Sequence, residues 1–134
     1  MDRSGSGGVV MKDLTLVLVD KPGTFADVFE ALGKAGVNAV GTCGFPAAGE
    51  GILHVLVEDP DAARRAVQSV GLEVRAERDV VVLDPLPAQP GTGGAVLRRI
   101  ANQGVNVDLA YLTEDGRVVL SGDDVPALER AARS

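Results

Sequence analysis

Hydrophobic and polar positions alternate along the chain with two different periods, which predict short strands and amphipathic helices. Leu14–Val19 is a run of β-branched and leucine residues of strand length. It ends at Asp20–Gly23, which has the composition of a sharp turn. Four apolar residues then follow at the i, i+3, i+4 and i+7 spacing of one helix face: Phe25, Val28, Phe29 and Leu32. Gly36 stands at the C-cap position, so we expect the helix to stop there.

The segment up to residue 76 continues with two strands, a second helix and an alternating edge strand: Ala39–Cys43, Ile52–Val57, Asp59–Gly71 and Leu72–Ala76. Pro46–Gly51 is expected to form the loop between the two strands. In the second helix the apolar side is predicted from four residues: Ala63, Ala66, Val67 and Val70. The order βαββαβ is the ferredoxin-like plan. We expect the first and third strands, the most apolar, to lie centrally and parallel.

The chain repeats itself. Pro22-Gly23-Thr24 matches Pro90-Gly91-Thr92 at an offset of 90 − 22 = 68, and the same offset places Gly36-Val37-Asn38 on Gly104-Val105-Asn106. Seven of the 17 positions from Pro22 to Asn38 are identical, where unrelated sequence gives about one or two. The sequence therefore contains a duplication.

The second copy begins at Val80–Leu83 and continues as helix, strand, hairpin at Glu114–Gly116, strand and a helix from Asp124. We predict an α+β fold of two ferredoxin-like βαββαβ repeats, the second lacking its last strand, with antiparallel sheets and helices on one face. The expected division is a flexible tail over 1–11, a first repeat over 12–78 and a second over 79–134. Because open sheet edges are usually covered, we expect Val9–Lys12 or a partner copy's sheet at the edge that lacks a strand.

Composition narrows the possible functions. At 46% apolar and 24% charged the chain is typical of a globular protein, and it holds no apolar run of the roughly 20 residues that span a bilayer. A net charge of −6 repels nucleic acid, and only 3% of the residues are aromatic, too few for base stacking. One Cys and one His cannot build a zinc site or a disulfide. We expect a cytoplasmic protein with no cofactor, no membrane partner and no nucleic-acid partner.

Four motifs in order resemble the tandem ACT-domain proteins, which are amino-acid-sensing regulatory modules of amino-acid metabolism. They are Asp20–Gly23 before a helix, Gly36–Asn38 after it, Gly51–Leu53 in a strand and Glu58–Pro60 at a helix start. The resemblance covers nearly everything from residue 14 to residue 133. It implies that small amino acids bind where two ACT units meet, against the first β-α loop and the start of the second strand.

Carried over residue by residue, the resemblance implies ligand-binding roles for Asp20, Lys21, Pro22, Gly23, Thr24 and Asn38 in the first repeat, and for Gln89, Pro90, Gly91, Thr92 and Asn106 in the second. The second repeat departs from the first at Ala88, which stands in the place of Asp20. It also has Gly93-Gly94 where the first repeat has Phe25-Ala26. The site of the second repeat is therefore expected to be vestigial or to serve only as a wall of the ligand site.

The chemistry of such a site follows from its residues. The N–H groups of Gly23 and Thr24 lie at a helix N-terminus, where unpaired donors and the helix dipole favour a carboxylate. Asn38 offers a donor and an acceptor, and Asp20 offers a counter-charge for an ammonium group. Glycine at positions 23 and 91 permits close approach of the ligand to the backbone.

Each of these residues also has a structural interpretation. Pro-Gly is common in turns that bind nothing, and Asp20 is suited to capping its own turn. Asn38 and Asn106 are suited to the left-handed conformation that follows a helix. Gly91–Gly94 lacks the Gly-Lys-Ser/Thr ending of a phosphate loop.

No catalytic group emerges from the sequence. His54 is interpreted as a packed histidine, because no Ser, Cys or Asp is adjacent to it in the sequence, and Cys43 as a small hydrophobic residue. With no nucleophile-base pair and no paired carboxylates visible, we expect a protein that is not an enzyme.

Two functions remain open. The first is a non-enzymatic regulator in which an amino acid bound between ACT units changes assembly or a partner enzyme of amino-acid metabolism. The second is an interaction module that binds no ligand and associates through its sheets. Leu14, Leu16 and Leu18 form one face of the first strand, and Thr15, Val17 and Val19 form the other. Since helices cover only one face, either function predicts an oligomer, with a homodimer as the simplest form.

Overall fold

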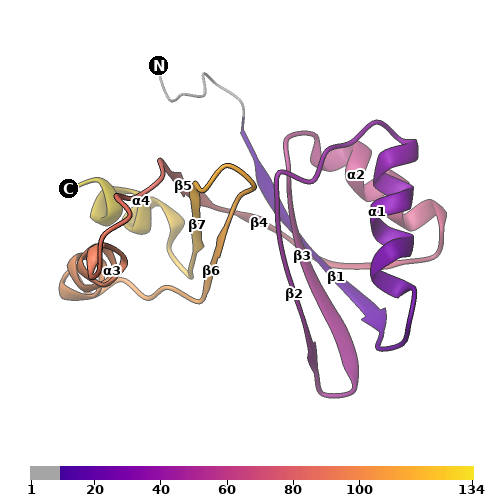
Figure 1. The fold of residues 1–134 in the computed structure, drawn as a ribbon, viewed down its shortest axis with the longest axis horizontal. Helices are drawn as coiled ribbons and strands as arrows, with labels where there is room; N and C mark the ends of the chain where they lie inside the picture. The colour runs from indigo at the N-terminus through magenta and orange to yellow at the C-terminus, as the bar shows by residue number, and fades with distance from the viewer. Residues whose placement is uncertain (1–9) are drawn as a thin grey trace. The chain divides into compact units, whose positions relative to one another are not determined.

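The computed structural model describes residues 10–134, and the chain divides between Arg78 and Asp79 into two compact units (Figure 1). The first unit holds two helices and four strands: β1 Lys12–Val19, α1 Thr24–Lys34, β2 Gly41–Ala47, β3 Glu50–Val57, α2 Pro60–Ser69 and β4 Glu73–Asp79, whose last residue already belongs to the second unit. The second unit holds two helices and three strands: β5 Val81–Leu83, α3 Thr92–Asn102, β6 Leu109–Leu112, β7 Val118–Ser121 and α4 Val125–Arg133.

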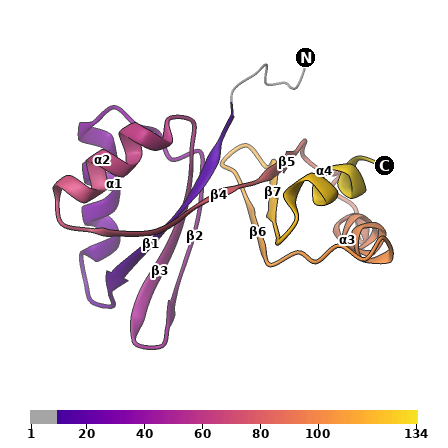
Figure 2. The ribbon, with the colours of Figure 1, turned by 180° about the vertical axis from the view of Figure 1, so that it is seen from behind.

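The first sheet has the strand order β2-β3-β1-β4 and the second the order β5-β7-β6. In the first unit α1 and α2 lie on one face of the sheet, as the two opposite views in Figures 1 and 2 show. The expected α+β fold of two ferredoxin-like repeats is confirmed, with β1 and β3 at the centre of the first sheet.

The expectation that the two central strands run parallel is wrong. β1 pairs with β3 in antiparallel register, from Lys12 opposite Val57 to Val19 opposite Glu50. The reason lies in the connections. Helix α1 returns the chain to the start of β1, and the tight hairpin between β2 and β3 then reverses its direction.

The predicted loop Pro46–Gly51 is also wrong in extent. β2 continues through Ala47 and β3 starts at Glu50, so the connection is only Ala48-Gly49. Both residues have positive φ, 51° and 82°, which is the backbone of a type I′ hairpin turn. This turn matches the twist of the two strands and lets both extend further than their composition indicates.

Two predicted core stripes are only partly buried. Val28 and Leu32 lie in the core of the first unit, whereas Phe25 and Phe29 are 40% and 39% exposed. Thr24 and Ala31 take buried positions of α1 instead. Leu14, Leu16 and Leu18 belong to the core cluster, so they form the helix-facing side of β1.

The same departure occurs in α2, where Ala63, Ala66 and Val67 are buried and Val70 is 54% exposed. Val70 lies outside the regular part of the helix, at its C-cap. The helical period therefore no longer applies at this residue.

Helix ends are built identically in the two repeats. After α1 the N–H of Val37 donates to Leu32 O at 2.9 Å, and after α3 the N–H of Val105 donates to Ile100 O at 3.4 Å. Between them Gly36 and Gly104 have φ of 71° and 74°. This is the Schellman arrangement of a glycine C′ residue. The sequence duplication is thus a duplication of backbone geometry.

The sheet of the second unit has β5 at one edge and β6 at the other. Within residues 10–134 no strand lies beside the free edge of β5, the position that corresponds to β4 in the first sheet. Lys12 pairs with Val57 on one edge of β1, and Val9 lies outside the described residues, so the expectation that Val9–Lys12 covers the edge of β5 stays a prediction. Coverage by a partner copy stays a prediction.

Candidate functional site

The turn that precedes α1 has the geometry of a type II turn. Gly23 has φ 92° and ψ −14°, the conformation that such a turn needs at its third residue. The N–H of Thr24 reaches Lys21 O only at 3.5 Å, and the Thr24 hydroxyl donates to the same carbonyl at 3.2 Å. A Cβ at Gly23 would meet no atom within 4 Å. Glycine is therefore required here by the backbone conformation and not by a crowded neighbour.

The second repeat copies this turn. Gly91 has φ 92° and ψ −9°, and the N–H of Thr92 lies 3.4 Å from Gln89 O. The Thr92 hydroxyl donates to Pro87 O at 2.8 Å and to Gln89 O at 3.1 Å. The loss of an acid at Ala88 and the gain of two glycines at 93 and 94 leave the turn itself unchanged.

Of the two backbone donors predicted for a carboxylate, the N–H of Thr24 is bonded within its own turn, to Lys21 O at 3.5 Å, and the N–H of Gly23 is not. The N–H groups of Gly23 and Gly91 make no hydrogen bond to the described part of the chain, and their carbonyls accept the first helical bonds, from Asp27 and Ala95, both at 2.9 Å. A helix N-terminus with unpaired N–H groups attracts an anion. The N–H of Gly23 or Gly91 can therefore donate to a carboxylate without breaking an internal hydrogen bond, whereas the N–H of Thr24 or Thr92 would have to leave its bond within the turn.

Asp20 and Lys21 are exposed, and neither side chain makes a hydrogen bond or ion pair with residues 10–134. The interpretation of Asp20 as a side-chain cap of its turn is therefore wrong. The neighbouring Pro22, Gln89 and Pro90 are also exposed. Both turns thus present polar groups to solvent.

The two asparagines are placed differently from the turns. Asn38 and Asn106 follow the C-terminal ends of α1 and α3, whereas the turns precede the N-terminal ends of these helices. Each helix has 11 residues and is therefore about 16 Å long. Within one repeat the turn and the asparagine are not brought together.

The left-handed interpretation of the asparagines is wrong, because the only non-glycine residue with positive φ among those described is Ala48. Gly36 and Gly104 take that conformation instead. Both asparagine side chains are exposed and make no hydrogen bond within the described part of the chain. The backbone of Asn106 is held closely, since a Cβ added at Gly122 would collide with its carbonyl oxygen.

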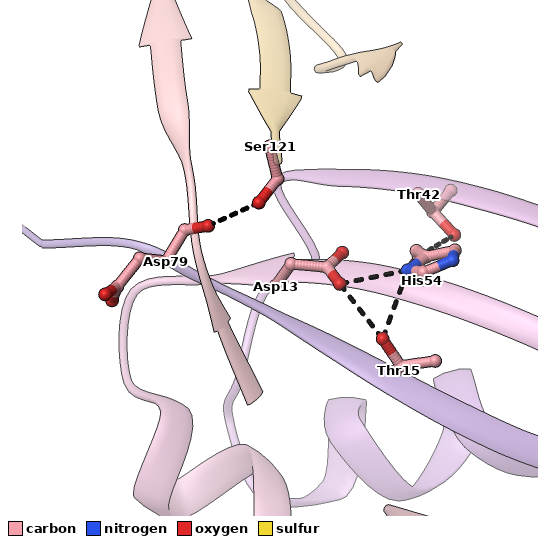
Figure 3. Close-up of polar contacts among 6 residues, drawn as sticks. All are labelled: Asp13, Thr15, Thr42, His54, Asp79 and Ser121. Atoms are coloured by element: carbon pink, nitrogen blue, oxygen red, sulfur yellow. Dashed lines mark hydrogen bonds and ion pairs between the residues drawn. The ribbon is translucent and has the colours of Figure 1, made fainter. Parts of the chain in front are cut away.

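A buried polar cluster in the first sheet was missed by the sequence reasoning. His54 Nδ1 lies 2.9 Å from Asp13 Oδ2, and the Thr15 hydroxyl lies 3.3 Å from each of these two atoms (Figure 3). Asp13 is 0% and His54 is 7% exposed. The Thr42 hydroxyl donates to His54 O at 2.9 Å. His54 is thus packed, as expected, and its carboxylate partner Asp13 comes from 41 residues away in the sequence.

A sequence signal for this cluster exists in the strand period. Asp13 and Thr15 fall on the same side of β1, opposite the leucines, and Thr15 pairs with His54 across the strands. Cys43 pairs with His54 on the other flank and is partly buried. An alignment of the strands would have been needed to recognise this arrangement.

No three His, Cys, Asp or Glu side chains in the described part of the chain gather as metal ligands. Among residues 10–134 no helix is long and apolar enough to cross a membrane. A shallow groove lined by residues of α1 and the end of α2 includes none of the predicted site residues; its lining is Asp27, Glu30, Ala31, Lys34 and Val70.

Solved structures with this fold exist. Protein BT0572 from Bacteroides thetaiotaomicron matches with a TM-score of 0.80 and 28% identity, over 93% of this chain and 88% of that chain. The ligand-free regulatory subunit of aspartate kinase from Thermus thermophilus matches with a TM-score of 0.68 and 21% identity, over 93% and 91%. The regulatory subunit of aspartate kinase from Thermus flavus gives 0.67 and 20%, over 93% and 92%. No family model and no curated protein matches the sequence.

These likenesses define the class of fold. The chain has the α+β fold of ACT regulatory domains, in two copies, and the resemblance stated from the sequence motifs is confirmed at this level. The candidate binding features of this chain are the two glycine turns and the two exposed asparagines.

Proposed function

We propose that this protein is a non-enzymatic regulatory protein of amino-acid metabolism that binds a free amino acid at the turns preceding α1 and α3. The observation that carries the proposal is the conserved geometry of the two turns, each with a glycine at φ 92° whose N–H is unpaired within the described chain. Each turn therefore offers an N–H donor at a helix N-terminus, where an anion is favoured.

The chemistry fits a zwitterion. The carboxylate is received by the N–H of Gly23 and by the N-terminus of α1, and the Asp20 carboxylate is the counter-charge for the ammonium group. In the second repeat Ala88 stands in place of Asp20, so that turn has the anion donors without the acidic partner. The first repeat is therefore the stronger site.

The position of the asparagines supports a site that is shared by two ACT-like units. Because about 16 Å of helix separates Asn38 from the turn of its own repeat, an asparagine that contacts the same ligand comes from another unit. We propose that the amino acid binds between two ACT-like units, with the turn supplied by one and the asparagine by the other. The proposed repeats keep the limits 12–78 and 79–134.

Regulation follows from binding between units. A ligand that contacts both units favours the assembly in which they meet, by as much as its affinity differs between the two states, typically about 1–3 kcal/mol. The proposed regulated partner is an enzyme of amino-acid metabolism or a second copy of this chain. Support comes from the similar fold of proteins named as regulatory subunits of aspartate kinase.

The experiment is a thermal-shift screen of the twenty amino acids, followed by titration calorimetry of those that raise the melting temperature. One or a few are expected to bind, and Asn38→Ala together with Asn106→Ala is expected to abolish the response without changing assembly. Gln68→Ala, an exposed position on α2, is the matched control. No response from any amino acid contradicts the proposal.

The second candidate is an interaction module without a ligand. It is favoured by the exposed end of the first sheet, where Val19 is 65% and Phe45 is 42% exposed. Light scattering separates the two functions, because this candidate requires an oligomer whose mass is the same with and without amino acids.

A further inference from the structure

The second helices of the two repeats are equivalent residue by residue. α2 is capped by Asp59, which accepts from the N–H of Ala62 at 3.1 Å, and α4 by Asp124, which accepts from the N–H of Ala127 at 3.0 Å. The offset between these caps is 124 − 59 = 65. Carried along the helix, it places Glu129 at the position of Arg64.

In the first unit this position binds the fourth strand. Arg64 Nη1 donates to Glu77 Oε1 at 2.5 Å, so a basic residue of α2 meets an acidic residue of β4. β4 itself is the neighbour of β1 in the sheet. The ion pair therefore links the second helix to the strand that completes the sheet.

In the second unit the charge at this position is reversed and the strand is absent from the described chain. Glu129 forms an ion pair with Arg133 of the same helix. Arg133 Nη2 in turn donates to Val82 O, in the middle of β5, at 3.2 Å. α4 packs against β5, as Figure 1 also shows, so its last turn reaches the strand that has a free edge.

This arrangement leaves a partly protected edge. A free strand edge pairs readily with another extended chain unless a charge or a bulge guards it. Arg133 is such a guard, but its side chain is 52% exposed and its bonds are to one carboxylate and one carbonyl at the surface. An incoming strand that satisfies Val82 and Glu129 can replace it.

We propose that the free edge of β5 is a docking site for an extended segment of another protein, which pairs with Val81–Leu83 and places a lysine or arginine against Glu129. The segment takes the position that β4 has in the first sheet, with the charge of Glu77 reversed. A second copy's β5 does not fit, because Val80–Asp84 carries an acid and no basic residue.

The test uses two synthetic peptides as probes. The first has the chain's own sequence over residues 71–80, and the second is identical except for Glu77→Lys. Each is titrated to millimolar concentration into the full chain, and the amide resonances of Val81–Leu83 are followed. The lysine peptide is expected to bind at least about fivefold more tightly than the natural peptide.

Variants of the chain supply the controls. Glu129→Lys is expected to reverse the preference between the peptides, and Glu129→Gln to remove it. Arg133→Ala is expected to tighten the binding of the lysine peptide, because it frees both Val82 O and Glu129. A lysine peptide with N-methyl groups on the backbone is expected not to bind. Melting curves confirm that each variant is folded. If Glu129→Lys unfolds α4, the neutral variant Glu129→Gln still tests the role of the charge.

The proposal is overturned if neither peptide shifts the resonances of β5, or if Glu129→Lys leaves the preference unchanged. It is also overturned if light scattering and the same resonances show that two copies pair through β5 without peptide. These results do not depend on amino-acid binding, so they leave the proposed regulatory function to its own test.

Discussion

Gly23 and Gly91 adopt the same left-handed backbone conformation, with φ of 92° in both. They stand at equivalent places in two repeats whose surrounding residues have diverged, from Phe25-Ala26 in one to Gly93-Gly94 in the other. What has been kept is a turn that ends in an unpaired N–H at the start of a helix. This relationship is the basis of the proposed amino-acid site.

Replacing either glycine tests whether its conformation is strained for other residues. Gly23→Ala and Gly91→Ala are each expected to lower the free energy of unfolding by about 1–2 kcal/mol, because a Cβ is disfavoured at this φ. Gly33→Ala is the control, since Gly33 lies in the last turn of α1 with open space around it and no positive φ. It is expected to leave the free energy of unfolding unchanged or to raise it by up to about 0.5 kcal/mol. Urea denaturation measures all three, and equal effects at Gly23 and Gly33 would contradict the assignment.

Asp13 and His54 are expected to contribute to the free energy of unfolding as a coupled, buried pair. Asp13→Val alone leaves the buried imidazole without this carboxylate, and the free energy of unfolding is expected to fall by about 3–5 kcal/mol. The double variant Asp13→Val, His54→Leu is expected to lose less than the sum of the two single variants. Denaturant titration of the four proteins gives the coupling energy. Strict additivity would show that the 2.9 Å contact contributes nothing.

Gly44 and Phe25 are expected to constrain one another. A Cβ at Gly44 would lie 2.8 Å from Cε2 of Phe25 and 3.1 Å from Cδ1 of Leu53. Gly44→Ala is therefore expected to destabilise the protein by about 1–3 kcal/mol through overpacking. Adding Phe25→Leu, which shortens the side chain, is expected to restore part of the loss. If Phe25→Leu makes Gly44→Ala worse, the phenylalanine does not lie over this strand in solution.

Acid is expected to remove the stabilisation that Asp115 gives to the hairpin between β6 and β7. The Thr113 hydroxyl donates to Asp115 at 2.5 Å and Arg117 donates to the same carboxylate at 2.9 Å, and these bonds lower the pKa of Asp115. The stabilisation is present above the unfolded pKa of about 3.9 and is lost as pH falls through the lower folded value. Asp115→Asn should therefore reduce the melting temperature at pH 7 and have no effect near pH 2. The exposed Glu114→Gln is the control, and a difference that persists unchanged in acid would contradict the assignment.

The fold could be predicted because local signals and the duplication agree. Turn residues and helix caps fixed the elements, and Asp59 and Asp124 cap their helices as their positions before Pro60 and Val125 suggest. The predictions were wrong where tertiary contacts, and not the local sequence, determine burial or backbone conformation. Phe25 and Phe29 have helical spacing, but they lie at the margin of the face that packs on the sheet and stay partly exposed. The composition of Pro46–Gly51 predicts a loop, whereas the structure has a two-residue hairpin in which Ala48 takes a positive φ that is rare for alanine.

The site was less accessible from the sequence. The turns at Gly23 and Gly91 were found because the repeat points to them twice. The separation of Asn38 from its own turn is a property of the helix between them, which returns the chain to the other end of the sheet. Asp13 and His54 are 41 residues apart along the chain, and only the strand register brings them together.

The central claim is that the N–H groups of the two turns receive the carboxylate of a free amino acid. The most direct measurement is a titration of isotope-labelled protein with the amino acid that raises its melting temperature, following the amide resonances of Gly23, Thr24, Gly91 and Thr92. We predict that the Gly23 and Thr24 amide protons move to lower field as the ligand saturates, with a smaller change or none at Gly91 and Thr92. Binding that leaves the amides of both turns unmoved would contradict the account.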